Sequence, residues 1–135
     1  MILITDELRA RLLANGAVET ETDHVPVVKL FNPVGAATWL LTELDAYGDT
    51  LFGLCDLGFG FPELGSVSLA ELQAVKGPLG LGIERDLYFA PRFPLSVYVE
   101  AARVAGHITE TEQLLRHAAA ALALAHSELP PDAGG

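Results

Sequence analysis

Hydrophobic and polar residues alternate along the chain with two different periods. Several short segments are rich in apolar and β-branched side chains and are bounded by glycine, proline, asparagine or aspartate, a pattern typical of β-strands. The predicted strands cover residues 25–31, 36–44, 50–57, 64–67 and 83–89. Because turn residues connect the first four closely, we expect an antiparallel meander of about four or five strands.

Four other segments carry the spacing and the end signals of helices. They cover residues 5–14, 68–76, 94–105 and 109–127. Ser68 with Glu71, and Thr109 with Glu112, match the capping box, in which a hydroxyl and a carboxylate satisfy backbone N–H groups at a helix start. Gly106 separates the last two helices, which are predicted to form an αα-hairpin.

These elements predict one small α+β domain over residues 1–128, with an N-terminal helix, a short central helix and the C-terminal hairpin packed on one face of the meander. A chain of 135 residues, 50% of them hydrophobic, can bury one core but not two. The final Leu-Pro-Pro-Asp-Ala-Gly-Gly, residues 129–135, predicts a disordered tail.

The segment between the third and fourth strands contains glycine at positions 58, 60 and 65. A phosphate-binding loop would lead from a strand into a helix, with G-x-G-x-x-G spacing or a P-loop lysine. Neither spacing is present, and the nearby acids Asp56 and Glu63 would repel a phosphate. We therefore interpret the segment as a hairpin turn.

The formal net charge of −10 disfavours direct binding to nucleic acid, because phosphate contacts need clustered Lys and Arg. No membrane association is expected, since no apolar run approaches the roughly 20 residues that span a bilayer. Cys55 is the single cysteine, which suits a cytoplasmic protein. The charge favours a protein partner with a basic surface, and no particular cofactor is implied.

The chain has no Lys or Arg between Lys29 and Lys76. The acids in this interval are Glu43, Asp45, Asp49, Asp56, Glu63 and Glu71. In a meander they would give one edge or face of the sheet a single charge, as in a docking surface for a basic partner or a metal site. They would equally serve as solvated residues at strand ends that discourage edge pairing.

Glu43 and Asp56 lie within or at the end of apolar strands. With a period of two, Glu43 shares a face with Trp39 and Leu41, and Asp56 shares a face with Leu54. Neighbouring strands could bring the two carboxylates together for acid–base chemistry or for a divalent ion. Alternatively, both carboxylates accept hydrogen bonds from nearby hydroxyl and amide groups.

Glu84, Arg85 and Asp86 form a compact charged triplet. Arg85 could bind an anion, or it could pair across the sheet with an acid. With Glu43 and Asp56, the triplet supplies the residues of an alternative hypothesis, a small enzyme or metal-binding domain in which Arg85 orients an anionic substrate.

The last predicted helix is apolar around much of its circumference. Its leucines are Leu114, Leu115, Leu122 and Leu124, interleaved with alanines. This pattern predicts close packing against the sheet or the seam of a homodimer.

Five blocks of the chain occur together in this order: residues 29–33 (KLFNP), 37–45 (ATWLLTELD), 52–65 (FGLCDLGFGFPELG), 68–72 (SLAEL) and 79–86 (LGLGIERD). Together they resemble a bacterial family, domain of unknown function 2958. The resemblance covers about residues 5–107 and leaves the Ala-rich last helix outside. The polar positions that match the family are Thr38, Trp39, Thr42, Glu43, Asp56, Glu63, Glu84, Arg85 and Asp86.

The family has no assigned activity, so the resemblance implies only a setting. Its members are often encoded on plasmids and integrating elements of bacteria. We therefore expect a non-enzymatic accessory protein that binds a basic protein partner through an acidic sheet surface at Glu43, Asp56 and Glu63. One version of this hypothesis is a DNA mimic, although mimics carry a denser acidic array than a chain with 19% charged residues. An enzyme would instead bring its candidate side chains together in one pocket.

Overall fold

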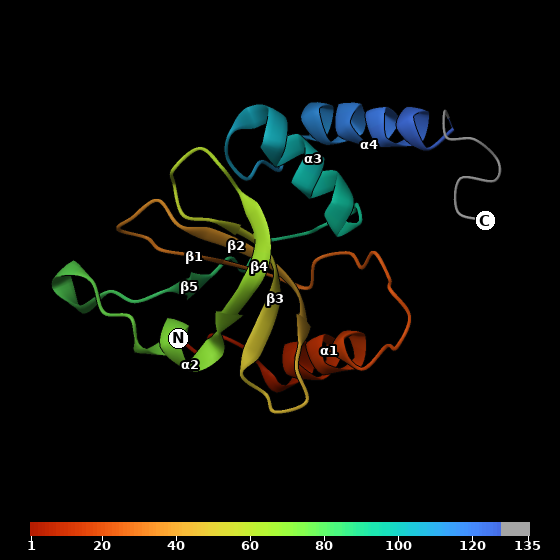
Figure 1. The fold of residues 1–135 in the computed structure, drawn as a ribbon. Coiled ribbons are helices and arrows are strands. Elements are labelled where there is room, and N and C mark those ends of the chain that lie inside the picture. The colour runs from red at the N-terminus through yellow and green to blue at the C-terminus, as the bar shows by residue number, and fades with distance from the viewer. Residues whose placement is uncertain (128–135) are drawn as a thin grey trace.

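The predicted strands form one antiparallel sheet in the computed structural model, which describes residues 1–127 (Figure 1). The strands are β1 (Val28–Phe31), β2 (Thr38–Leu44), β3 (Thr50–Asp56), β4 (Glu63–Ser68) and β5 (Glu84–Arg85). Their order in the sheet is β4-β3-β2-β1-β5. The meander is therefore confirmed for the first four strands, and β5 is added beside β1. The tail predicted for residues 129–135 lies outside the described residues.

The fifth strand is much shorter than the predicted segment 83–89. Only Glu84 and Arg85 pair with β1. The Asp86 carboxylate then accepts a hydrogen bond from the Tyr88 backbone N–H at 2.9 Å, which turns the chain away from the sheet.

The helices cover both faces of the sheet, so the expectation of a single covered face is wrong. The helices are α1 (Asp6–Gly16), α2 (Leu69–Ala74), the 3₁₀ turn η1 (Pro78–Gly80), α3 (Leu95–Ala105) and α4 (Glu112–Ser127). In Figure 1, α1 and α2 lie on one side of the sheet, and α3 and α4 lie on the other. The α+β class and the helix pair α3–α4 are as predicted.

Each face of the sheet has its own hydrophobic core. The α1 side buries Leu12, Leu30, Trp39, Leu41, Leu44, Leu51 and Leu72, among others. The α3 side buries Leu40, Leu54, Tyr98, Ala102, Leu115 and Ala118, among others. Consecutive residues 39–41 are all buried although they point alternately to the two faces. Such continuous apolar runs are typical of strands that are covered on both sides.

A β-bulge interrupts the pairing of β2 with β3 between Leu41 and Glu43. Leu41 pairs with Gly53, but Glu43 pairs with Phe52, so β2 contains one extra residue at this point. The extra residue turns Glu43 to the face opposite Leu41. The period of two predicted the same face for both residues, and the bulge makes that prediction wrong.

The first two helices begin at hydroxyl caps, and Ser68 forms its half of the predicted capping box, whereas the Glu71 carboxylate makes no return bond among residues 1–127. The Thr5 hydroxyl accepts a hydrogen bond from the Leu8 N–H, and the Ser68 hydroxyl accepts one from the Glu71 N–H, each at 3.2 Å. At α2 the second partner is Asp49, whose carboxylate accepts from the Ala70 N–H at 2.8 Å and from the Ser68 hydroxyl at 2.7 Å. These bonds lower the pKa of Asp49.

The C-terminal helices meet at Gly106, which adopts a left-handed conformation with φ of 82° and ends α3 as predicted. The second capping box is not formed. The Thr109 hydroxyl accepts instead from the Thr111 N–H at 3.2 Å, and the Thr111 carbonyl begins the helix by accepting from the Leu115 N–H. The helix α4 packs against α3, which lies between α4 and the sheet (Figure 1).

Candidate functional site

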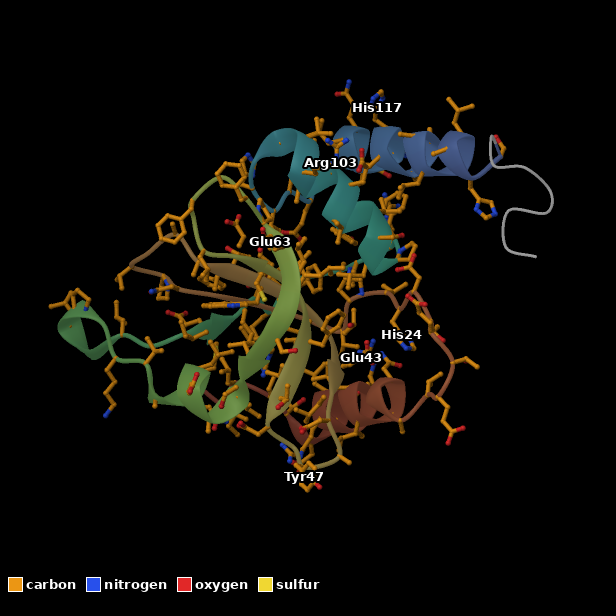
Figure 2. All side chains as sticks on the ribbon, viewed as in Figure 1. His24, Glu43, Tyr47, Glu63, Arg103 and His117 are labelled. Carbon is orange, nitrogen blue, oxygen red and sulfur yellow. The ribbon has the colours of Figure 1, made fainter. Side chains whose placement is uncertain are left out.

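A hollow of about 790 Å³ lies where loop 17–27 passes the ends of the central strands and α3. We call it the acidic hollow. Its polar lining includes Glu19, Glu21, Asp23, His24, Glu43 and Glu100. Its apolar lining includes Val18, Phe52, Leu64, Leu95, Val99 and Leu122. Figure 2 shows Glu43 and His24 in the same region, between α1 and α3.

Three hydrogen bonds position the walls of the acidic hollow. The His24 carbonyl accepts from the Leu95 N–H at 2.8 Å, and the Asp23 carboxylate accepts from the Ser96 N–H at 3.0 Å. Asp23 thus supplies, from a distant loop, the cap that Pro94 cannot give to α3. On the opposite wall, the Asn15 amide donates to the Thr42 carbonyl at 2.9 Å, next to the bulge. The loop is therefore tied to α3, and the end of α1 is tied to β2.

The charge in the acidic hollow has one sign. Within the described part of the chain, no Lys or Arg lines it. Arg103 lies nearby on α3 and pairs with Glu100, and this hydrogen bond lowers the pKa of Glu100. Glu43 is half-buried and has no ion-pair partner among residues 1–127. A partly desolvated carboxylate beside apolar side chains favours a ligand with both cationic and apolar groups.

Asp56 is 4% exposed and has a structural position. One carboxylate oxygen accepts from the Gly58 N–H and the other from the Ile108 N–H, each at 2.9 Å. Asp56 therefore ties the end of β3 to the connection between α3 and α4. Glu43 pairs with Phe52, four positions from Asp56 along β3, which is a separation of roughly 13 Å. Both side chains face the α3 side, but they form no carboxylate pair.

Glu63 lies at the start of the edge strand β4 and is exposed (Figure 2). It pairs with Cys55, which packs against the core on the α1 side, so Glu63 faces away from the acidic hollow. Its neighbour Leu64 faces the hollow and lines it. The three acids predicted for partner binding therefore do not share one surface.

The charged triplet lies at the opposite edge of the sheet. The Arg85 guanidinium donates to the carbonyl oxygens of Ile2 and Leu3 at 2.7 and 2.8 Å, and among residues 1–127 it forms no ion pair. Asp86 pairs with Lys29 at 3.4 Å, and Lys29 also pairs with Glu110. Burial alone lowers the pKa of Lys29, but these two carboxylates outweigh it and raise the pKa.

The five residues of the enzyme hypothesis are divided among separate places. Glu84, Arg85 and Asp86 line a second hollow of about 540 Å³, which neither Glu43 nor Asp56 lines. Within residues 1–127, no group of three or more His, Cys, Asp or Glu side chains is arranged to hold a metal ion. The geometry therefore offers these residues no common catalytic centre.

Sequence reasoning identified Glu43 and missed the rest of the acidic hollow. Loop 17–27 has no periodic pattern, and its contacts with α3 join residues more than 70 positions apart. The one available signal is the run of acids Glu19, Glu21 and Asp23, which has no basic residue within it. Among residues 1–127, no helix is long and apolar enough to cross a bilayer.

A family model described as protein of unknown function (DUF2958) matches residues 3–109, which include every strand of the sheet, α1 to α3 and the walls of the acidic hollow except Leu122. No curated protein and no solved structure matches the chain. The helix α4 lies beyond the matched region, as the resemblance predicts. Since the match covers most of the sequence, the chain belongs to the DUF2958 family of proteins of unknown function.

Proposed function

We propose that the protein is a non-enzymatic accessory protein that binds a basic segment of a protein partner in the acidic hollow. The single observation that carries this proposal is that Glu43, which has no ion-pair partner among residues 1–127, lies with further acids and apolar side chains in one concave site. Lysine and arginine side chains have an aliphatic stem and a charged end, so they match both parts of such a lining.

The three predicted acids have different roles in this proposal. Glu43 lies in the acidic hollow and would contact the partner's cation directly. Glu63, exposed next to Leu64, would meet a partner that extends over the edge of the sheet. Asp56 is buried and would act indirectly, by holding the α3–α4 connection in place.

The setting that we propose is the bacterial cytoplasm, in a system carried by a plasmid or an integrating element. The resemblance and the single cysteine support this setting. A DNA mimic is the more specific version, in which the partner's basic surface is itself a DNA-binding groove. A concave acidic site fits a protruding basic segment better than it fits such a groove.

The charge contribution can be measured with a fluorescein-labelled peptide of alternating lysine and valine. Replacing Glu43 by glutamine is expected to raise the Kd about fivefold, since a partly exposed charge contact is worth about 1 kcal/mol. Glu7→Gln removes the same charge from the exposed start of α1, outside the acidic hollow, and is the matched control. Added salt should weaken the binding of both wild type and control.

Equal binding by Glu43→Gln and Glu7→Gln would contradict the proposal, because it would reduce the interaction to net charge. Equally tight binding of a peptide in which glutamate replaces lysine would also contradict the proposal. Fluorescence anisotropy measures both comparisons under one buffer condition.

We also propose that two copies of the chain associate through the outer side of α4. Leu124 is 62% exposed there, among alanines that allow close approach of a second helix. Sedimentation equilibrium should show a concentration-dependent dimer that Leu124→Glu reduces to monomer. A wild-type chain that stays monomeric at high concentration would overturn this proposal.

A further inference from the structure

The two edge strands of the sheet differ in length and in whether another segment covers them. At β5 the paired segment has two residues, and residues 1–3 cover it. The Arg85 N–H faces the Met1 sulfur at 3.2 Å, and the Arg85 side chain holds the carbonyl oxygens of Ile2 and Leu3. At the other edge, β4 has six residues and pairs with β3 alone. In Figure 1, β4 lies in front of β3, at the edge of the sheet nearest the viewer.

The register of the β3–β4 pair identifies the backbone groups on the open edge. The Leu69 N–H donates to the Asp49 carbonyl at 2.8 Å, so the next pair, Thr50 with Ser68, is a non-hydrogen-bonded pair. Alternation then directs the N–H and C=O groups of residues 63, 65 and 67 toward β3. Those of Leu64 and Ser66 point outward. Both residues are exposed, and no hydrogen bond among residues 1–127 uses these four groups.

The open edge lacks most of the features by which proteins block strand addition. Such features are lysines on the edge, a bulge, an inward-pointing charge or a covering segment. The strand β4 pairs in regular register with no bulge and carries no Lys or Arg. Pro62 precedes it, and its one charged residue, Glu63, stands at its start.

The open edge is continuous with the acidic hollow. Leu64 and Ser66 pair with Leu54 and Phe52, so all four side chains lie on the α3 side of the sheet. Leu64 and Phe52 line the acidic hollow. Alternate side chains of a strand added beside β4 would therefore lie next to its rim, on the same face as Glu43.

We infer that β4 accepts an added strand, supplied by an extended segment of a protein partner that carries lysine or arginine at alternate positions. This inference rests on the proposed function and states how the partner is bound. Backbone hydrogen bonds to Leu64 and Ser66 align the segment, and its basic side chains reach the acidic hollow.

Electrostatics favours a basic partner segment beside β4 over the β4 strand of a second copy of the chain. Pairing two β4 strands would bring together two edges that each carry Glu63 and border an acidic hollow, with no Lys or Arg on either strand. A segment with alternating basic side chains places opposite charges beside the acids.

The substitution Ser66→Pro tests the inference, because it removes an outward N–H and leaves the β3–β4 hydrogen bonds intact. The control Ser66→Ala removes the hydroxyl and keeps the N–H. With the labelled lysine–valine peptide, we expect Ser66→Pro to raise the Kd about tenfold and Ser66→Ala to leave it unchanged. In the wild type, the amides of Leu64 and Ser66 should exchange hydrogen more slowly when the peptide is bound.

The hydrogen-exchange measurement uses the wild-type chain, so it decides the question even if Ser66→Pro fails to fold. If Glu43→Gln weakens binding but Ser66→Pro does not, and the two amides stay unprotected, strand addition is wrong and the proposed function stands. If the glutamate peptide protects these amides as well as the lysine peptide does, the edge binds strands without charge selection, and the basic partner is wrong. If the lysine–valine peptide does not bind the wild-type chain, both the proposed function and the strand-addition inference are wrong.

Discussion

Alanine in place of Asp56 is expected to lower the free energy of unfolding by about 2–4 kcal/mol. The substitution removes the acceptors of the Gly58 and Ile108 N–H groups, and an unsatisfied buried donor costs about 1–3 kcal/mol. Because the Ile108 bond joins β3 to the α3–α4 connection, the helix pair should loosen from the sheet as well. Urea unfolding followed by Trp39 fluorescence measures the loss.

Asp45→Ala is the matched control for this prediction. The Asp45 carboxylate also accepts two backbone hydrogen bonds, from the Asp49 and Thr50 N–H groups, but at a turn where water can replace it. We expect a smaller loss, about 1 kcal/mol. Equal losses for the two variants would contradict the view that Asp56 matters because it is buried. The structural position of Asp56 also makes its variants unsuitable as direct tests of partner contact.

Alanine in place of Gly53 is expected to cost about 3 kcal/mol or more. A Cβ atom at this position would lie 2.0 Å from the Leu40 carbonyl oxygen and 2.8 Å from the Leu41 Cα. Both are backbone atoms of the neighbouring strand, so neither can move aside without disturbing the β2–β3 pairing. Differential scanning calorimetry should show a large decrease in the melting temperature.

Gly65→Ala is the control, since Gly65 pairs directly with Gly53 on β4. A Cβ atom there would meet only the Cys55 sulfur, at an ordinary contact distance of 3.8 Å. Its effect should stay within about 0.5 kcal/mol. If both glycine variants lost the same stability, the cost would come from strand glycines in general and not from the close approach of β2.

The meander and most of the helix ends were predictable because local chemistry determines them. Thr5, Ser68 and Gly106 act within a few residues of the helices that they begin or end. Turn residues also marked the strand ends to within a few positions. The αα-hairpin followed from the same reasoning, since its two helices are adjacent in sequence.

The burial of both faces of the sheet is indicated by apolar runs that an alternating pattern of period two does not explain. Residues 39–41 are apolar without interruption, as are most of residues 51–55. Strands that are solvated on one face alternate instead. The continuous apolar runs therefore indicate helices on both sides of the sheet.

The acidic hollow depends on features that no local pattern carries. The bulge that reorients Glu43 arises because β2 has one residue more than the stretch of β3 with which it pairs. The sequence of β2 alone does not show this difference. The contact of Asp23 with Ser96 joins residues 73 positions apart. Asp49 caps α2 from 21 positions away. Such long-range partners appear only when the chain is folded.

The N-terminal cover of β5 has a consequence for the order of folding. The strands β1 to β4 pair with their neighbours in sequence, and short separations favour early formation of such contacts. The hydrogen bonds from Arg85 to residues 1–3 close loops of 82 to 84 residues. Loop closure of this length carries a larger entropy cost than any hairpin in the meander. Residues 1–3 are therefore expected to be among the last of the described residues to reach their final place.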